Sequence, residues 1–227
     1  MEKKTNIRRD DIIEMSAYEK LRKEKRAEIV RIKNNRRLAV GPYASFNFEC
    51  FETMWYQIHE MLRVEKGGET QIIDEILAYN PLIPKGTELV ATVMFEIPDA
   101  TQRANVLGNL GGVEGPITMK FSDEKIYAKA EEDVDRTNSV GKASSVHFVH
   151  FNMNLKQAEL FKDPNTRVII AIEHPNYGHM AVMPNFIKNE LKIDRAVLFA
   201  KYKRWMCLLD YNVENQVLDS LEVDRDL

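Results

Sequence analysis

Residues 167–183 read RVIIAIEHPNYGHMAVM. An apolar run rich in β-branched residues leads into Pro-Asn-Tyr-Gly, and a second apolar run follows, which is the pattern of two strands joined by a tight reversal. Strands joined in this way are antiparallel neighbours. If residues 175–178 form a four-residue loop, His174 and His179 flank that loop as an opposed pair.

The same hairpin closes an order of strand, helix, strand and strand that the sequence contains twice. The first copy is predicted to have a strand at 88–97, a helix from the Asp99 cap to about 110, a strand at 116–121 and a return at 125–130. The second copy is predicted to have a strand at 144–152, a helix from the Asn154 cap to about 162, a strand at 167–173 and a return at 179–183. Sequence identity between the copies is negligible, so the pattern is as compatible with coincidence as with duplication. It favours an α+β fold of mostly antiparallel sheets with helices packed on one side.

Helices are predicted before this region. Ser16 and Glu19 have the spacing of a capping box, so a helix is expected to begin there, within an N-terminal arm at 12–37 that docks on the body. Apolar residues at 54–62 recur with helical spacing, and a shorter helix is predicted at about 70–79. The domain prediction is one α+β domain at 1–194, followed by a C-terminal helical extension at 195–227.

The composition, 44% hydrophobic and 30% charged with a net charge of −3, is that of an ordinary folded protein. Residues 1–37 carry 13 Lys and Arg against 7 Asp and Glu, so the N-terminal part is basic. Glutamates interrupt the basic residues, which favours a solvated helix face over nucleic-acid binding. Two cysteines among apolar residues, and no apolar run of about 18 residues, predict a cytoplasmic protein with buried thiols and no membrane segment.

Three histidines are the candidate metal ligands. Opposed residues of a hairpin lie close enough for His174 and His179 to share an ion. A third ligand can come from His147, or from a carboxylate of Glu173, Glu60 or Glu49. Such a set suits a divalent transition metal, zinc or iron. The alternative is that both hairpin histidines flank an exposed turn. His147 and His150 are expected on opposite faces of one strand, and His59 is expected to meet water.

A polar stripe on the helix at 54–62 is the second candidate site. Its members and neighbours could line a pocket for a small polar or anionic ligand. The candidate ligand-binding residues are Glu49, Thr53, Gln57, Glu60, Arg63 and Tyr177. A helix face that simply meets water explains the stripe equally well. Glycine-rich phosphate loops, nucleophile elbows, H-E-x-x-H and paired C-x-x-C motifs do not occur, which disfavours the corresponding enzyme classes.

Several short motifs together resemble a bacterial family of unknown function. They are RRLAVGP at 36–42, Phe48-Glu49, Thr53, Tyr56-Gln57, EMLR at 60–63, YNPL at 79–82, Val146-His147 and HPNYGH at 174–179. The resemblance spans roughly residues 12–191. Genes of that family often neighbour those of a rubrerythrin and of an iron–sulfur oxidoreductase similar to a heterodisulfide reductase subunit, so the resemblance implies these proteins as partners. It implies no catalytic residue, because none is established for the family.

Two functional hypotheses follow. The first is an accessory protein of a redox or oxidative-stress system that holds a metal ion or small polar ligand at the histidine hairpin. The second is a non-catalytic interaction protein, homo-oligomeric or docked on an oxidoreductase. The sequence leaves open whether the protein is an enzyme.

Overall fold

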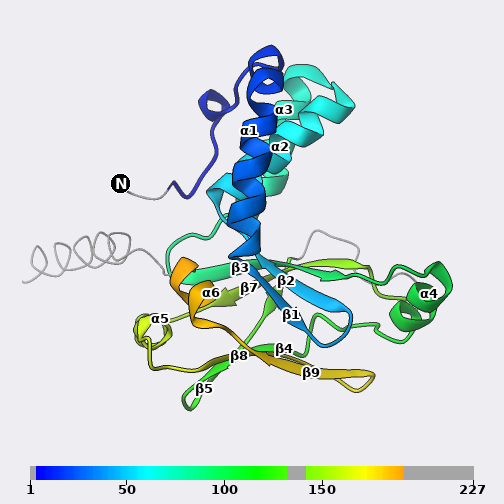
Figure 1. Ribbon diagram of the computed structural model, residues 1–227, viewed down its shortest axis with the longest axis vertical. Helices are drawn as coiled ribbons and strands as arrows, with labels where there is room; N and C mark the ends of the chain where they lie inside the picture. Colours follow the sequence, from blue (N-terminus) through cyan, green and yellow to red (C-terminus); the bar gives the residue numbers. More distant parts are fainter. Residues whose placement is uncertain (1–3, 132–141, 192–227) are drawn as a thin grey trace, which may run out of the picture. The chain divides into compact units, whose positions relative to one another are not determined.

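The computed structural model describes residues 4–131 and 142–191, which belong to one compact unit, Lys4–Ile193. Over these residues the chain forms six α-helices and two antiparallel sheets with nine strands (Figure 1), which confirms the predicted α+β class. The predicted extension at 195–227 lies outside the described residues. In the described part of the chain, no helix is long and apolar enough to cross a membrane.

The two sheets lie one above the other in Figure 1. The first has the order β1-β2-β3-β7-β6, with β1 (Arg37–Val40), β2 (Ala44–Phe48), β3 (Glu88–Phe95), β7 (Val146–Asn152) and β6 (Lys129–Ala130). The second has the order β5-β4-β8-β9, with β5 (Glu124–Tyr127), β4 (Ile117–Phe121), β8 (Val168–His174) and β9 (Tyr177–Val182). In β3 of the first sheet, Leu89, Ala91, Val93 and Phe95 are all buried on one face, as the two-residue period of a strand requires.

The predicted strand, helix, strand, strand order occurs twice, as β3-α4-β4-β5 and β7-α5-β8-β9, with α4 (Ala100–Gly108) and α5 (Leu155–Lys162). The first strands of the two copies, β3 and β7, pair with each other, and so do the second strands, β4 and β8. The helices begin alike, because Asp99 accepts from the Gln102 amide and Asn154 from the Gln157 amide. In Figure 1 they lie at opposite ends of the sheets. The copies are therefore arranged as a two-fold pseudo-repeat.

Three helices precede the repeat, pack on one another and rise from the first sheet (Figure 1), and together they are called the helical layer: α1 (Met15–Asn34), α2 (Phe51–Glu65) and α3 (Gly68–Tyr79). A buried cluster holds them there, in which Met54, Ile58 and Leu62 of α2 meet Val90 of β3. The described part of the chain also contains three short helices: η1 (Arg9–Asp11), η2 (Asn80–Leu82) and α6 (Asn185–Glu190).

The structure corrects two local predictions in the helical layer. The capping box at Ser16 and Glu19 is wrong, because α1 begins at Met15 and its N-cap, Glu14, makes no side-chain cap bond. His59 does not meet water, because its side chain is completely buried. The α2 face that carries His59 looks polar in sequence, but the N-terminal segment and α1 pack on it.

Candidate functional site

The histidine hairpin has a tighter turn than predicted. His174 pairs with Tyr177, Glu173 with Gly178, and Ile172 with His179, so the reversal contains two residues and not four. His174 and His179 are therefore diagonal on one face rather than directly opposed, a position in which Cβ atoms are about 7 to 8 Å apart. The predicted four-residue loop is wrong.

The three candidate metal ligands have separate surroundings. His174 Nδ1 accepts from the Asn176 amide at 3.2 Å, and its Nε2 lies 3.3 Å from the Gly111 carbonyl oxygen. His179 is exposed on β9, whereas His147 is buried in the other sheet with its Nε2 2.9 Å from the Ser144 carbonyl oxygen. Among the described residues no group of three or more His, Cys, Asp or Glu is placed to hold a metal ion. The zinc or iron prediction stays a prediction, without a ligand set in this structure.

Tyr177 joins the hairpin to the turn between β1 and β2. Its hydroxyl accepts from the amides of Tyr43 and Ala44, at 3.0 and 2.8 Å, and donates to the Val40 carbonyl at 2.8 Å. Gly41 of that turn has a φ of +73°, and a Cβ there would lie 2.5 Å from Cγ of His179. The motifs at 36–42 and 174–179, far apart in sequence, thus meet in one packed contact.

The predicted polar stripe of α2 faces three different neighbours. Thr53 donates to the buried Glu49 carboxylate at 2.6 Å, and Thr92 of β3 donates to its other oxygen at 2.6 Å. Gln57 hydrogen-bonds the Tyr79 side chain. These members of the stripe bond α2 to the first sheet and to α3.

Glu60 is the member of the stripe that bonds α1. Two nitrogens of Arg22 donate to the two oxygens of the Glu60 carboxylate, each at 2.8 Å. The Tyr18 hydroxyl donates to the same carboxylate at 2.7 Å. The Arg22 guanidinium lowers the pKa of the Glu60 carboxyl, and burial raises the pKa of Tyr18. This bidentate pair fixes α1 on α2.

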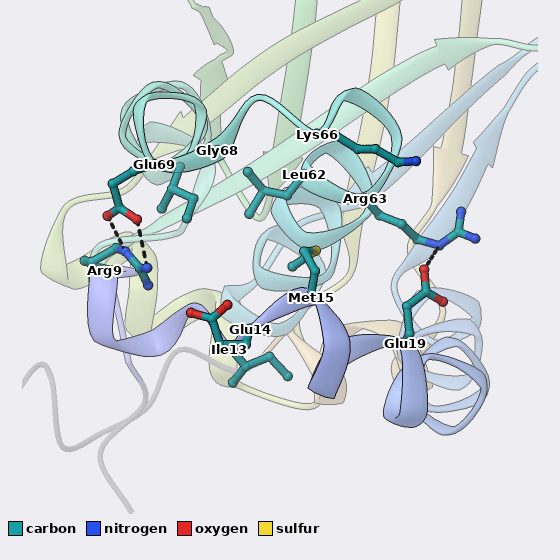
Figure 2. Close-up of a pocket in the computed structure, with 11 residues that line it drawn as sticks. Arg9, Ile13, Glu14, Met15, Glu19, Leu62, Arg63, Lys66, Gly68 and Glu69 are labelled. Carbon is teal, nitrogen blue, oxygen red and sulfur yellow. Dashed lines mark hydrogen bonds and ion pairs between the residues drawn. The ribbon is translucent and has the colours of Figure 1, made fainter.

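A pocket of about 510 Å³ opens in the helical layer (Figure 2). One wall comes from η1 and the start of α1, and the facing wall from the end of α2 and the start of α3. The lining residues are Arg9, Ile13, Glu14, Met15, Glu19, Leu62, Arg63, Lys66, Gly68, Glu69 and Ile72. Of the six predicted ligand-binding residues, Arg63 alone belongs to this set.

Two ion pairs tie the walls of the pocket together. Arg9 holds Glu69 through two bonds, at 2.5 and 2.9 Å, and Arg63 holds Glu19 at 2.7 Å. Figure 2 shows these pairs on either side of the aliphatic side chains of Met15 and Leu62. The pocket is therefore an apolar slot between charged groups, and its volume is within the usual range of about 300–1,000 Å³ for ligand sites.

The wall at residues 11–13 is anchored by α2. Trp55 Nε1 donates to the Asp11 carbonyl at 2.7 Å, and the Ile13 amide donates to Nε2 of His59 at 3.2 Å. Nδ1 of His59 lies 2.7 Å from the Trp55 carbonyl oxygen and so carries the proton. Burial lowers the pKa of His59, which keeps the ring neutral and Nε2 an acceptor.

Sequence reasoning missed most of this pocket because its residues come from four segments without a shared motif. A partial signal was present in Lys66-Gly67-Gly68, where a helix had to end and another begin. Lys66 has a φ of +56° and Gly68 a φ of +72°, so the chain reverses sharply and brings α3 beside the N-terminal segment.

Comparison with known proteins gives a family and a fold. The model of a family described as a protein of unknown function, DUF3501, matches residues 6–194. A crystal structure of a novel protein of unknown function from Burkholderia pseudomallei K96243 is 33% identical, with a TM-score of 0.76, over 82% of this chain and 97% of that chain. No curated protein matches. The chain belongs to the DUF3501 family.

Proposed function

We propose that this protein is a non-catalytic interaction protein whose helical layer docks a partner protein through the outer face of α3. One observation carries the proposal. None of the twelve residues of α3 is buried, although its sequence GETQIIDEILAY contains five large apolar side chains. A helix that is apolar on two sides and covered on one side alone presents a surface for another molecule.

The two sides of α3 differ in what they contact. Ile72, Ile76 and Tyr79 are partly buried against the core cluster of the helical layer. On the outer face, Ile73 is 53% exposed and Leu77 is 68% exposed. These two residues are four positions apart and therefore neighbours on the helix surface. Exposed apolar pairs of this spacing are the anchors that helical interfaces use.

The charge of α3 indicates the chemistry of the partner. The helix carries Glu69, Asp74 and Glu75 and no basic residue. Glu69 is paired with Arg9, whereas Asp74 stands next to Ile73 on the outer face. A complementary partner presents an apolar surface with basic side chains around it, because such a rim steers encounter and excludes partners of like charge.

The family resemblance makes a rubrerythrin and an iron–sulfur oxidoreductase the first partners to test. Purified full-length protein is titrated with each partner by calorimetry, and light scattering follows self-association. We expect Ile73→Asp with Leu77→Asp to weaken the complex at least tenfold, about 1.4 kcal/mol. Leu155→Asp, at a 51% exposed apolar position on α5, is the matched control.

Two results would overturn the proposal. One is unchanged affinity in the double variant. The other is failure of both candidate partners to bind the wild-type protein at concentrations up to about 100 µM, well above the range of specific complexes. A dimer that the double variant abolishes, with neither partner bound, would replace partner docking by self-association.

A further inference from the structure

We infer that the pocket of the helical layer binds a small zwitterion with an aliphatic body, of the class of short apolar peptides with free ends. Neither Ile73 nor Leu77 lines this pocket, so the inference stands apart from partner docking.

The apolar part of the pocket determines the body of the ligand. Ile13, Met15, Leu62 and Ile72 are the aliphatic lining residues, and no aromatic side chain is among the lining residues described. Leu62 belongs to the buried core cluster, and Met15 and Ile72 pack against it. An aliphatic chain in the slot therefore continues the core and is removed from water, at about 25 cal/mol per Å² of apolar surface buried.

The pocket has open space beside Gly68 at the start of α3. An added Cβ at Gly68 would find no heavy atom within 4 Å. The surrounding ion pairs, Arg9 with Glu69 and Arg63 with Glu19, are complete within the protein. They fix the two walls relative to each other without requiring a ligand.

Two charged lining residues determine the polar groups of the ligand. Three basic and three acidic residues line the pocket. After the two ion pairs are formed, Glu14 and Lys66 are the remaining charges, and neither forms an ion pair with another of the described residues. Figure 2 places Glu14 on the N-terminal wall and Lys66 on the facing wall.

A ligand with one charge would satisfy one of these groups and leave the other without a partner. A free peptide satisfies both, since its ammonium suits Glu14 and its carboxylate suits Lys66. An extended dipeptide or tripeptide separates its ends by about 7 to 11 Å, which allows the two charges to reach different walls. Aliphatic side chains fill the space between them.

The test uses the full-length protein and calorimetry with four probes. Leu-Leu carries every proposed feature, N-acetyl-Leu-Leu-amide lacks both charges, Gly-Gly lacks the aliphatic body, and octanoate lacks the ammonium. We expect Leu-Leu to bind at least tenfold more tightly than each of the other three. Equal binding of octanoate, or no binding of Leu-Leu at about 10 mM, would refute the inference.

Substitutions locate the site. Glu14→Gln and Lys66→Gln are each expected to weaken Leu-Leu at least fivefold and to leave the weak binding of the blocked peptide unchanged. Lys20→Gln and Glu24→Gln, at exposed positions of α1 that do not line the pocket, are the matched controls. Far-ultraviolet circular dichroism checks the fold of each variant. Equal weakening by the control substitutions would also overturn the inference.

Discussion

Replacing Tyr177 by Phe tests the contact that joins the two family motifs. The substitution keeps the ring and removes the hydroxyl, which bonds three backbone groups of the β1–β2 turn. Water cannot easily replace it, because Tyr177, Val40 and Ala44 are 3%, 0% and 2% exposed. The amides of Tyr43 and Ala44 then lose their acceptor inside the protein.

The loss of folding free energy can be estimated from the two amides and the carbonyl that the hydroxyl bonds. A buried polar group without a partner costs about 1–3 kcal/mol, and two amides and one carbonyl lose theirs together. The three costs sum to about 3–9 kcal/mol, but rearrangement of the turn allows the Ala44 amide to approach the Val40 carbonyl, so the loss is expected near the lower end of that range. We expect a loss of about 2–4 kcal/mol, which for a chain of this length lowers Tm by roughly 5–15 °C.

Urea unfolding followed by circular dichroism measures the loss. Tyr43→Phe is the matched control, since its hydroxyl accepts a bond from the exposed Gln102 amide. Removal of that hydroxyl is expected to cost less than about 0.5 kcal/mol. A loss below about 1 kcal/mol for Tyr177→Phe would show that the hydroxyl does not hold the turn. If a ligand binds to the wild type and not to a fully folded Tyr177→Phe variant, the prediction that Tyr177 binds a ligand would be supported.

Two further predictions concern the same packing and the pocket wall. Gly41→Ala is expected to lower the free energy of unfolding in urea by about 2 kcal/mol or more, because alanine is strained in the left-handed region and overpacks its surroundings. Gly41 has a φ of +73°, and its added Cβ would meet the His179 ring. Gly108→Ala, where the added Cβ meets open space, should be neutral or stabilising, and similar losses in both would contradict this explanation. For His59, the pKa in the folded protein is lower than the ordinary 6.5, so its contribution to stability is present above pH 6.5 and is lost as pH falls through the folded pKa. The urea midpoint of the wild type should therefore fall between about pH 7 and pH 5 more steeply than that of His59→Gln, and parallel profiles would argue against protonation of this ring.

The fold could be predicted because its signals are local. Asp99 and Asn154 begin their helices as expected, since a side-chain oxygen three residues before an orphaned amide is a property of a few adjacent residues. The hairpins follow from alternation and turn residues in the same way. Neither signal depends on contacts with residues far away in the sequence.

The candidate sites depended on tertiary contacts, which the sequence pattern does not contain. Because the hairpin loop has two residues instead of four, His174 lies opposite Tyr177 and is not directly opposite His179. The stripe lies on one helix, α2, as predicted. The same sequence pattern, however, is compatible with a stripe that faces water and with one that faces a neighbouring element. In this protein Glu60 faces Arg22 of α1.

Our proposals place the function in the helical layer rather than in the repeat. In the pseudo-repeat, the conspicuous hairpin residue Tyr177 holds backbone groups of the neighbouring sheet. The helical layer, which precedes the repeat, leaves Ile73 and Leu77 exposed and contains the pocket. If the repeat carried the function, Tyr177→Phe would reduce partner binding at temperatures where the variant is folded. If the helical layer carries it, Ile73→Asp reduces binding with stability unchanged, because an exposed side chain contributes little to the folded state of the isolated chain.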